Sequence, residues 1–449
     1  MRTPMKVYTV IPQVHTASFY YRLSVPIETA EMLGLPIKGV IDTNDAAKSQ
    51  QEKIMEFCDA DIITLYQPIG EAPLNNYRSL QGFLPSKKDG SWKYPPTLIV
   101  ETDDNLLNVS PLNSAFKTLG IRDMDGNQIP IGHHIGVANG GERKILWKDG
   151  ENGFSLAKNR QTIASYLKIL ETVDQVQCST PPVMEAIKKE ANTRRIRVFP
   201  NLIRFDHYPQ VALHQDPSKV NILWAGGQAH YEDWFPLREA IGNITRKYPQ
   251  IHWNIWGAQY PWVNELIPSH RYTFHGWCSY QEYKLRLVMM NHDIALAPLT
   301  SNLFNDSRSA IKWYEASVMK KPAATLAQNT ASYAREMVDG VTGLLFDDPK
   351  EFEEKLSRLI EDVELRKQLA ANSKDWLTEN RDAMKEVPKM VESWEQLRYD
   401  RTLEQPHPSE AQWKVIEAED VEEQKQEIEA EAQKGVSANE PVPALAESG

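Results

Sequence analysis

The sequence predicts an α/β protein made of two consecutive parallel-sheet domains that face each other across a cleft. Short apolar runs alternate with longer amphipathic stretches along the chain, which is the pattern of βαβ units. The alternation starts afresh near residue 220, after a segment rich in turn formers. A chain of 449 residues, 41% of them hydrophobic, is long enough to bury two cores. Each half is therefore expected to be a Rossmann-like sheet.

The first half is expected to hold five strands and four helices in alternation. The strands are predicted at 6–11, 61–66, 97–101, 175–178 and 196–199, and the helices at 24–33, 47–58, 159–172 and 182–190. In the second half, strands are predicted at 220–224, 252–256, 272–275, 293–297, 322–326 and 343–346. The helices between and after them are predicted at 235–247, 280–290, 310–319, 330–338, 348–361 and 363–377.

The domain boundaries follow from this alternation. We predict a first domain at 1–200, a second domain at 201–382, a helix at 383–401 that packs back toward the first domain, and a mostly disordered acidic tail at 402–449. An insertion at 106–150 interrupts the alternation of strands and helices predicted for the first domain. Because it is too long for an ordinary connection and follows a strand end, we expect a functional loop or lid there.

Charge and cysteine content narrow the class of protein. Residues 401–449 hold 4 Lys and Arg against 12 Asp and Glu, so most of the net charge of −11 lies in the tail and the rest is nearly neutral. No global basic field is available for nucleic acid, although Lys188-Lys189 and Arg194–Arg197 form either a local basic stripe or a solvated helix end. The three widely spaced cysteines predict a reducing, cytoplasmic location. No apolar run is long enough for a membrane span.

The segment FNDSRSAIKWYEASVMKKPAA, which begins at Phe304, carries the most chemical information. It places a small polar loop before a helix, and helix starts bind phosphate through free N–H groups and the helix dipole. Arg308 and Lys312 are four residues apart and would share one helical face. Glu315, one turn deeper, could then accept hydrogen bonds from a ribose. A nucleotide-diphosphate pocket and an ordinary capped amphipathic helix both fit this segment.

Other loops are expected to meet this segment at one edge of the second sheet. WAGGQAHYEDW follows a strand and contains Gly226 and Gly227, which permit close approach of a ligand, and then His230. HGWCSYQEY at 275–283 and APLTSN at 297–302 also follow strands. A tight turn with a capping histidine is the alternative for the first of these loops. Four strand ends that deliver loops to one crevice favour a true pocket.

The first domain offers fewer candidates. Tyr21 and Arg22 lie in the loop after the first strand and are expected to face the cleft on the acceptor side. Asp103 and Asp104 end a strand, where they could bind a metal ion, contact a substrate hydroxyl or cap a helix. No other acid or histidine cluster has ligand spacing, so no metal is expected. GxGxxG, GxxxxGK[ST], GxSxG and HExxH are all absent, which argues against a classical dinucleotide site, a P-loop, a serine hydrolase and a zinc hydrolase.

These pieces together resemble a glycosyltransferase of the GT-B fold, and the second half looks like the retaining, family-4 type. The resemblance is carried by WAGGQAHYEDW, YTFHGWCSYQEYKLRLVMMNHDIALAPL, FNDSRSAIKWYEASVMKKPAA and VDGVTGLLFDDPKEF, in the expected order over about 221–375. The run from VETDDNLL through LWKDGENGF to STPPV and FPN looks like glycosyltransferases encoded by bacteriophages and surface-polysaccharide clusters.

The resemblance implies roles for particular residues. Arg308 and Lys312 would bind the diphosphate, Gly226 and Gly227 would face the phosphates, and Glu315 would contact the ribose. The family places a second glutamate, which contacts the donor sugar, where this chain has Ser307, so sugar contacts would come from backbone amides at 306–309, around Ser309. The base would be bordered by His275, Gly276, Trp277, Pro298 and Leu299.

The implied reaction is sugar transfer from a nucleotide-diphosphate sugar, expected to be a UDP-sugar, by front-face displacement with retention and without a metal or cofactor. Arg308, Lys312, Asp103, Asp104 and His230 are the candidate catalytic residues. The acceptor would be a glycan, a wall polymer, a protein or the hydroxymethylated DNA of a phage. Two alternatives stay open: a nucleotide-sugar epimerase that uses Asp103, Asp104 and His230 as acid and base, and a non-catalytic nucleotide-sugar-binding partner protein.

Overall fold

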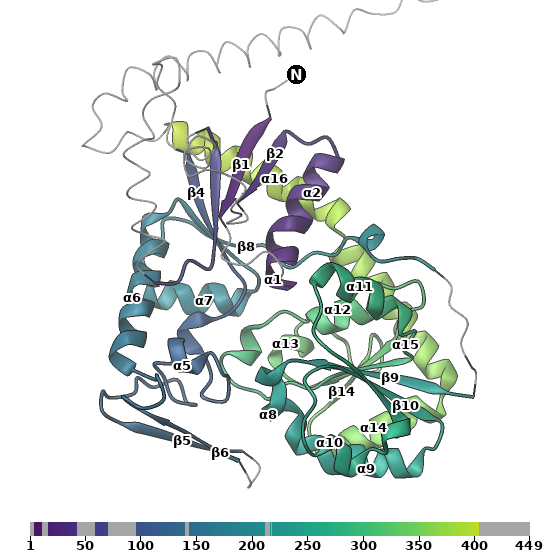
Figure 1. Cartoon of the computed structure of the whole chain (residues 1–449). Helices are drawn as coiled ribbons and strands as arrows, with labels where there is room; N and C mark the ends of the chain where they lie inside the picture. The colour runs from purple at the N-terminus through teal and green to yellow at the C-terminus, as the bar shows by residue number, and fades with distance from the viewer. Residues whose placement is uncertain are drawn as a thin grey trace, which may run out of the picture.

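The computed structural model describes residues 4–10, 17–42, 59–70, 96–139, 143–211, 216 and 218–403. These residues form two domains, each built on a six-stranded sheet with helices packed around it (Figure 1). The predicted α/β architecture of two Rossmann-like domains is confirmed. The predicted helix at 47–58 and residues 404–449 of the predicted tail lie outside the described residues.

The sheet of the first domain is parallel, with strand order β2-β1-β3-β4-β7-β8. Its central strand β4 is buried along its whole length, which explains why it appears in the sequence as a continuous apolar run. The edge strand β2 was not predicted, because its lysine and glycine interrupt the apolar run. The strands are β1 (Met5–Val10), β2 (Ile37–Asp42), β3 (Ile62–Tyr66), β4 (Thr97–Thr102), β7 (Gln175–Cys178) and β8 (Ile196–Val198).

Helices of the first domain begin where the sequence supplies helix starts. In α6 (Leu156–Thr172) the side chain of Ser155 caps the N-terminus by accepting from the N–H of Lys158, and α7 (Pro181–Glu190) begins with two prolines. The short α1 (Ala17–Phe19) continues through a π-helical turn, Tyr20–Ser24, into α2 (Val25–Met32). Such π turns occur frequently at functional sites.

The sheet of the second domain is also parallel, in the order β11-β10-β9-β12-β13-β14. Its strands are β9 (Val220–Gly226), β10 (Ile251–Gly257), β11 (Tyr272–His275), β12 (Ile294–Ala297), β13 (Ala324–Gln328) and β14 (Leu344–Phe346). The core beneath it contains the stacked rings of Trp224 and Trp234, with centroids 4.1 Å apart. The helices are α8 (Tyr231–Trp234), α9 (Arg238–Lys247), α10 (Val263–Leu266), α11 (Tyr280–Met289), α12 (Ile311–Ser317), α13 (Ala331–Ala334), α14 (Pro349–Glu361) and α15 (Val363–Asn380).

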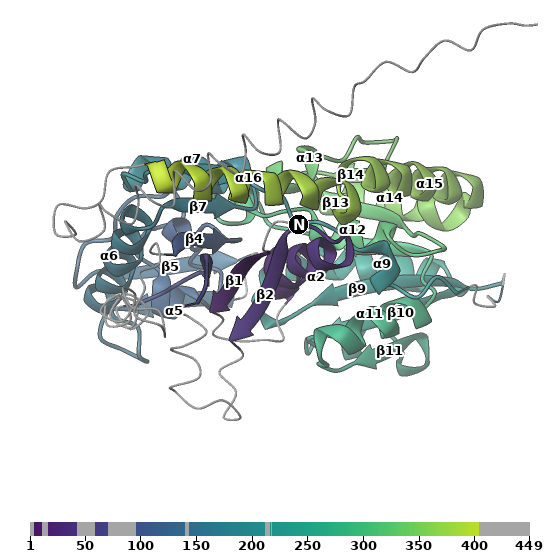
Figure 2. The ribbon, with the colours of Figure 1, turned by 90° about the horizontal axis from the view of Figure 1, so that it is seen from above.

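The last described helix, α16 (Ala383–Leu403), returns from the second domain to the first, as Figure 2 shows. It buries Val387, Trp394 and Leu397. The indole N–H of Trp394 donates to Gln177 Oε1 of β7 over 3.1 Å, which fixes the helix to the first sheet. No helix among the described residues is long and apolar enough to cross a membrane.

The insertion at 106–150 contains a short helix, α5 (Phe116–Leu119), and an antiparallel hairpin of β5 (His134–Asn139) and β6 (Arg143–Lys148). Its base packs into the core of the first domain, where the Phe116 ring stacks on Phe154 with centroids 5.6 Å apart. Asn159 of α6 donates to the Gly120 carbonyl over 2.9 Å. Figure 1 shows the hairpin extending from the first domain beside α5.

Candidate active site

A cavity of about 110 Å³ lies between the two domains, at the carboxyl ends of their parallel strands. Open α/β sheets bind their ligands in this position. Residues of both domains line it, and so does Asn201 of the segment that connects them. The predicted site residues that line the cavity are Tyr21, Asp103, Asp104, His230, Leu299, Arg308, Ser309 and Lys312.

The two predicted phosphate-binding cations both reach this cavity, but not from one helical face. α12 begins only at Ile311, and Asn305–Ser307 form a separate 3₁₀ turn that ends at Arg308 in extended backbone. The prediction that Arg308 shares a helix with Lys312 is therefore wrong. The reason is local, because Asn302 Oδ1 accepts from the N–H of Asn305 over 2.9 Å and stabilises the turn.

Lys312 contributes a buried cation to the cavity wall. Its Nζ is buried, and it has no hydrogen-bond partner among the residues that the structure describes. Burial lowers the pKa of Lys312 to about 8, although the Asp233 carboxylate opposes this shift. An unpaired buried charge is costly, so this wall of the cavity favours an anionic ligand.

Arg308, in contrast, is paired across the domain interface. Its Nε lies 3.3 Å from Asp104 Oδ1, at the end of β4 in the first domain. Burial and the neighbouring carboxylate of Asp103 raise the pKa of Asp104, while Arg308 lowers it. Asp103 and Asp104 therefore hold a segment of the second domain in place.

Asn201 is a site residue that the sequence analysis did not single out. Its Nδ2 donates to Asp103 Oδ1 over 3.0 Å and to Ser309 Oγ over 2.9 Å, so that one side chain joins the two domains inside the cavity. FPN, the run that contains Asn201, contributed only to a family resemblance. Its position directly after a strand and a proline was the one available signal.

Arg22 does not face the cleft, contrary to the prediction. Its guanidinium is buried and donates to Glu101 Oε2 over 2.6 Å and 3.2 Å, and also to the carbonyl of Phe199 and the side chain of Asn201. Burial raises the pKa of Glu101 to about 7 despite this ion pair. Arg22 therefore holds Asn201 in position through a hydrogen bond and is not among the residues that line the cavity.

His230 lies at the end of the 3₁₀ turn that follows β9. Its Nδ1 is 2.6 Å from Asp233 Oδ2, and Asp233 Oδ1 accepts from the N–H of Thr300 over 2.7 Å. Burial, together with the charge of Lys312, lowers the pKa of His230 to about 4, so its ring is neutral at neutral pH. Nε2 of a ring held in this way is a hydrogen-bond acceptor.

Ser307 is buried and does not line the cavity. Its hydroxyl donates to the carbonyl of Leu303 over 2.6 Å and accepts from Asn105, and its carbonyl accepts from Thr180 over 2.5 Å. The backbone N–H groups of residues 306–308 donate to the carbonyls of 302, 304 and 305 inside the turn. The backbone amides of 306–308 are therefore already engaged and not free for the expected sugar contacts, whereas Ser309 lines the cavity.

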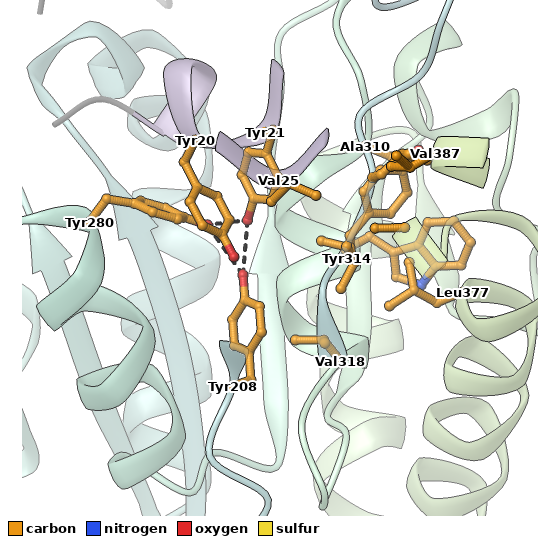
Figure 3. Close-up of a cluster of buried hydrophobic side chains, with 14 of the residues drawn as sticks. Tyr20, Tyr21, Val25, Tyr208, Tyr280, Ala310, Tyr314, Val318, Leu377 and Val387 are labelled. Atoms are coloured by element: carbon orange, nitrogen blue, oxygen red, sulfur yellow. Dashed lines mark hydrogen bonds between the residues drawn. The ribbon is translucent and has the colours of Figure 1, made fainter. Parts of the chain in front are cut away.

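Glu315 is also outside the cavity lining, in a buried cluster of tyrosines. Its Oε1 accepts from Tyr21 over 2.9 Å and from Tyr280 over 3.0 Å, and its Oε2 accepts from Tyr283 over 3.0 Å. Figure 3 shows the hydroxyl groups of Tyr21, Tyr208 and Tyr280 directed toward one another. Glu315 therefore joins the domains through Tyr21, and three tyrosine hydroxyl groups already occupy the carboxylate that is predicted to contact a ribose.

The predicted glycines and the predicted base-binding residues other than Leu299 are not among the residues that line the cavity. A Cβ atom at Gly226 would lie 3.2 Å from His230 Cβ, and one at Gly227 would lie 3.1 Å from Trp277. Trp277 itself is 78% exposed. His275 stacks on Trp256, with ring centroids 5.3 Å apart. Gly276 and Pro298 are likewise not among the cavity-lining residues.

The fold and the position of the cavity define the class. The chain has the two-domain α/β fold of GT-B glycosyltransferases, as comparison with solved structures shows. HepE of Anabaena, in complex with UDP and glucose, aligns with a TM-score of 0.55 at 11% identity, over 87% of this chain and 99% of its own. Sucrose-phosphate synthase of Thermosynechococcus elongatus aligns with a TM-score of 0.54 at 11% identity, over 88% and 99%. A glycosyltransferase from Rickettsia africae aligns with a TM-score of 0.54 at 12% identity, over 88% and 99%.

Sequence comparison adds a match to the second domain. Residues 219–362 match the family model of glycosyl transferases group 1. This segment contains His230, Arg308 and Lys312 and lies within the stretch for which a family resemblance is expected. No curated protein matches the chain.

Proposed function

We propose that the protein is a glycosyltransferase that moves a sugar from a nucleotide-diphosphate sugar to an acceptor hydroxyl. The observation that carries the proposal is the unpaired Nζ of Lys312 beside Arg308 in a cavity between two Rossmann-like domains. Fixed cations at this position would stabilise the charge that develops on the leaving diphosphate. The group 1 match over 219–362, which includes both cations, supports the same conclusion.

The donor is proposed to be a UDP-sugar. UDP is the nucleotide bound by HepE, whose fold this chain shares. A thermal-shift panel of UDP-, GDP-, ADP- and CMP-sugars tests the proposal, because a ligand that binds the native state stabilises it by mass action. The UDP-sugars are expected to give the largest shift, accompanied by release of UDP on addition of an acceptor. A shift with another nucleotide alone would reassign the donor, and no shift with any of them would overturn the proposed function.

The reaction is proposed to proceed with retention and without a metal ion. Arg308 and Lys312 supply the positive charge that a divalent ion would otherwise bring to the diphosphate, while Asp103 and Asp104 are engaged by Asn201 and Arg308. Activity is therefore expected to survive EDTA. The anomeric proton of the product, observed by NMR at early times, reports the stereochemistry, and an inverted product would refute retention.

A glycan or polymer hydroxyl is proposed as the acceptor, in preference to modified phage DNA. The basic residues that could have formed a DNA-binding stripe are largely paired within the protein. Arg194 pairs with Asp174, Arg195 with Asp400, and Lys188 with Glu185. Gel-shift titration with DNA at low salt is expected to show no specific complex, and a complex would restore the DNA alternative.

Epimerisation of a nucleotide sugar remains the second candidate, because Asp103, Asp104 and His230 do meet in one cavity. Incubation with UDP-glucose in the absence of acceptor separates the two. Free epimerised nucleotide sugar would favour the epimerase, and UDP release that depends on an acceptor favours transfer.

A further inference from the structure

The ring nitrogens of His230 differ in their surroundings: Nδ1 lies beside Asp233, and Nε2 has no hydrogen-bond partner among the described residues. Its backbone N–H donates to the carbonyl of Gly227 over 3.0 Å, which fixes the residue at the start of α8. Its side chain lines the cavity together with Lys312 and Arg308. The ring is therefore held at the place where the cations would receive a phosphate.

Asp233 determines which ring nitrogen carries the proton. One carboxylate oxygen of Asp233 accepts from the backbone N–H of Thr300, and the other lies 2.6 Å from His230 Nδ1. Although burial raises the pKa of Asp233, the hydrogen bond from His230 lowers it further, and the net shift is downward. An ionised carboxylate can only accept, so Nδ1 must be the protonated nitrogen.

Nε2 of His230 is consequently an acceptor. Lys312 and Arg308, the two cations that influence the ring, both disfavour a second proton on it. Among the described residues, no hydrogen bond is formed by Nε2. The two carboxylates in the cavity wall, Asp103 and Asp104, already interact with Asn201 and Arg308.

We propose that His230 Nε2 accepts a hydrogen bond from a hydroxyl group of the transferred sugar while Lys312 holds the adjacent phosphate. Asp233 is the positioning residue that keeps Nδ1 protonated. The proposal rests on the function proposed above and adds a selection rule to it. The Lys312 ammonium and the unpaired acceptor His230 Nε2 together can recognise a phosphate group and a neighbouring hydroxyl group. A sugar diphosphate carries both. A sugar that lacks this hydroxyl would leave Nε2 unpaired in a desolvated site.

The first test needs no ligand. Nitrogen-15 NMR of the histidine side chains distinguishes the two neutral tautomers, and replacement of His230 assigns its signals. The free wild-type protein is expected to show the Nδ1-protonated neutral ring at pH 7, and Asp233→Asn is expected to lose the preference for it. An Nε2-protonated or doubly protonated ring at pH 7 in the wild-type protein would overturn the proposal.

The second test compares binding of UDP with binding of a panel of UDP-hexoses and their deoxy analogues by calorimetry. In wild-type protein the sugar is expected to strengthen binding over UDP alone. We call the ratio of the affinity for UDP-hexose to the affinity for UDP the sugar increment. His230→Ala is expected to lower the sugar increment by about a factor of ten and to leave the affinity for UDP itself within about twofold. The deoxy analogue that lacks the contacted hydroxyl should lose the same factor in the wild-type protein and nothing further in the variant.

The outcomes separate this proposal from the proposed function. An equal loss for UDP and UDP-hexose in His230→Ala, or an unchanged sugar increment, would overturn the role of His230 while the donor assignment stands. If the wild-type protein binds UDP-hexose no more tightly than UDP, the proposed role of His230 is overturned as well. Failure of wild-type protein to bind either ligand would overturn the proposed function and this proposal together. Asp233→Asn is the second variant, and its sugar increment is expected to fall as in His230→Ala without a further fall in the double variant.

Discussion

Replacing Lys312 with methionine should make the protein more stable and less active. Methionine keeps the length of the aliphatic chain but removes the charge, and the Nζ that it removes is buried without a partner in the described part of the chain. Burial lowers the pKa of Lys312 from 10.5 to about 8. At 1.36 kcal/mol per pKa unit, this shift corresponds to an upper bound on the order of 3 kcal/mol for holding the charge in place.

The sign of the pH dependence follows from the same shift. Because the folded pKa lies below the unfolded pKa, the unfolded chain binds the extra proton between about pH 8 and 10.5. The cost of the charge is fully present below about pH 8, falls progressively between pH 8 and 10.5, and is absent above 10.5. Chemical denaturation is therefore expected to show Lys312→Met more stable than wild type at pH 7, with a smaller difference at pH 9.5.

Activity should move in the opposite direction. Loss of one fixed donor to a developing oxyanion costs roughly a hundredfold to a thousandfold in turnover. UDP release from the best donor found in the thermal-shift panel is the assay. Lys320→Ala, an exposed lysine just beyond α12, is the matched control and should change neither property. Unchanged turnover in Lys312→Met would refute the phosphate assignment, and a large loss of stability at pH 7 would refute the claim that burial of its unpaired charge costs stability.

Three further predictions concern charges around the cavity. The affinity for UDP, measured by calorimetry, should be constant from pH 6.5 to pH 7.5 and fall above about pH 8 as Lys312 loses its proton, and an affinity that rises there would contradict its role. Arg22→Met leaves Glu101 buried without its partner and should lower the free energy of unfolding by roughly 3–5 kcal/mol at a pH well above 7, where Glu101 of the wild-type protein is ionised, which denaturation curves measure; a change below about 1 kcal/mol there would mean that the ion pair contributes little to stability. Asp104→Asn removes the carboxylate that pairs with Arg308 and should tighten UDP binding by up to about fivefold, since partly exposed ion pairs are worth at most roughly 1 kcal/mol; weaker binding would show that Asp104 helps to hold the ligand.

The sequence was sufficient for the central strands of the sheets because parallel strands buried on both faces are continuous apolar runs, whereas the edge strand β2 was missed. The predicted 175–178 and 272–275 coincide with β7 and β11, and most other predicted strands differ from the observed ones by one or two residues at an end. The convergence of strand-end loops was also predictable, since carboxyl ends of parallel strands meet at one edge. It brought His230, Leu299 and Lys312 into one cavity.

The other contacts of the site residues could not be predicted, because they depend on how the two domains pack together and on local turn geometry. Nothing near Glu315 in the sequence indicates that Tyr21, from the other domain, would occupy its carboxylate. Arg22 and Tyr21 are adjacent in one helical turn, so their side chains point in different directions: Arg22 pairs with buried Glu101, whereas Tyr21 lines the cavity. Helix periodicity likewise placed Arg308 on α12, whereas hydrogen bonds of the polar turn decided its backbone.

The two cations of the cavity enter binding in different states, and this has a consequence for the domains. Lys312 is unpaired among the described residues, so an incoming phosphate can approach it without displacing a protein group. Arg308 already interacts with Asp104 of the first domain, so a phosphate that binds Arg308 must compete with an interdomain ion pair. A phosphate group bound only at Lys312 is therefore expected to leave the interface intact, whereas a second group bound at Arg308 is expected to weaken it. Two other interdomain contacts involve neither cation. They are the hydrogen bond from Tyr21 to Glu315 and the hydrogen bonds of Asn201 with Asp103 and Ser309. If a diphosphate binds both cations as proposed, we expect it to weaken the contact at the cavity, while these other interdomain hydrogen bonds remain.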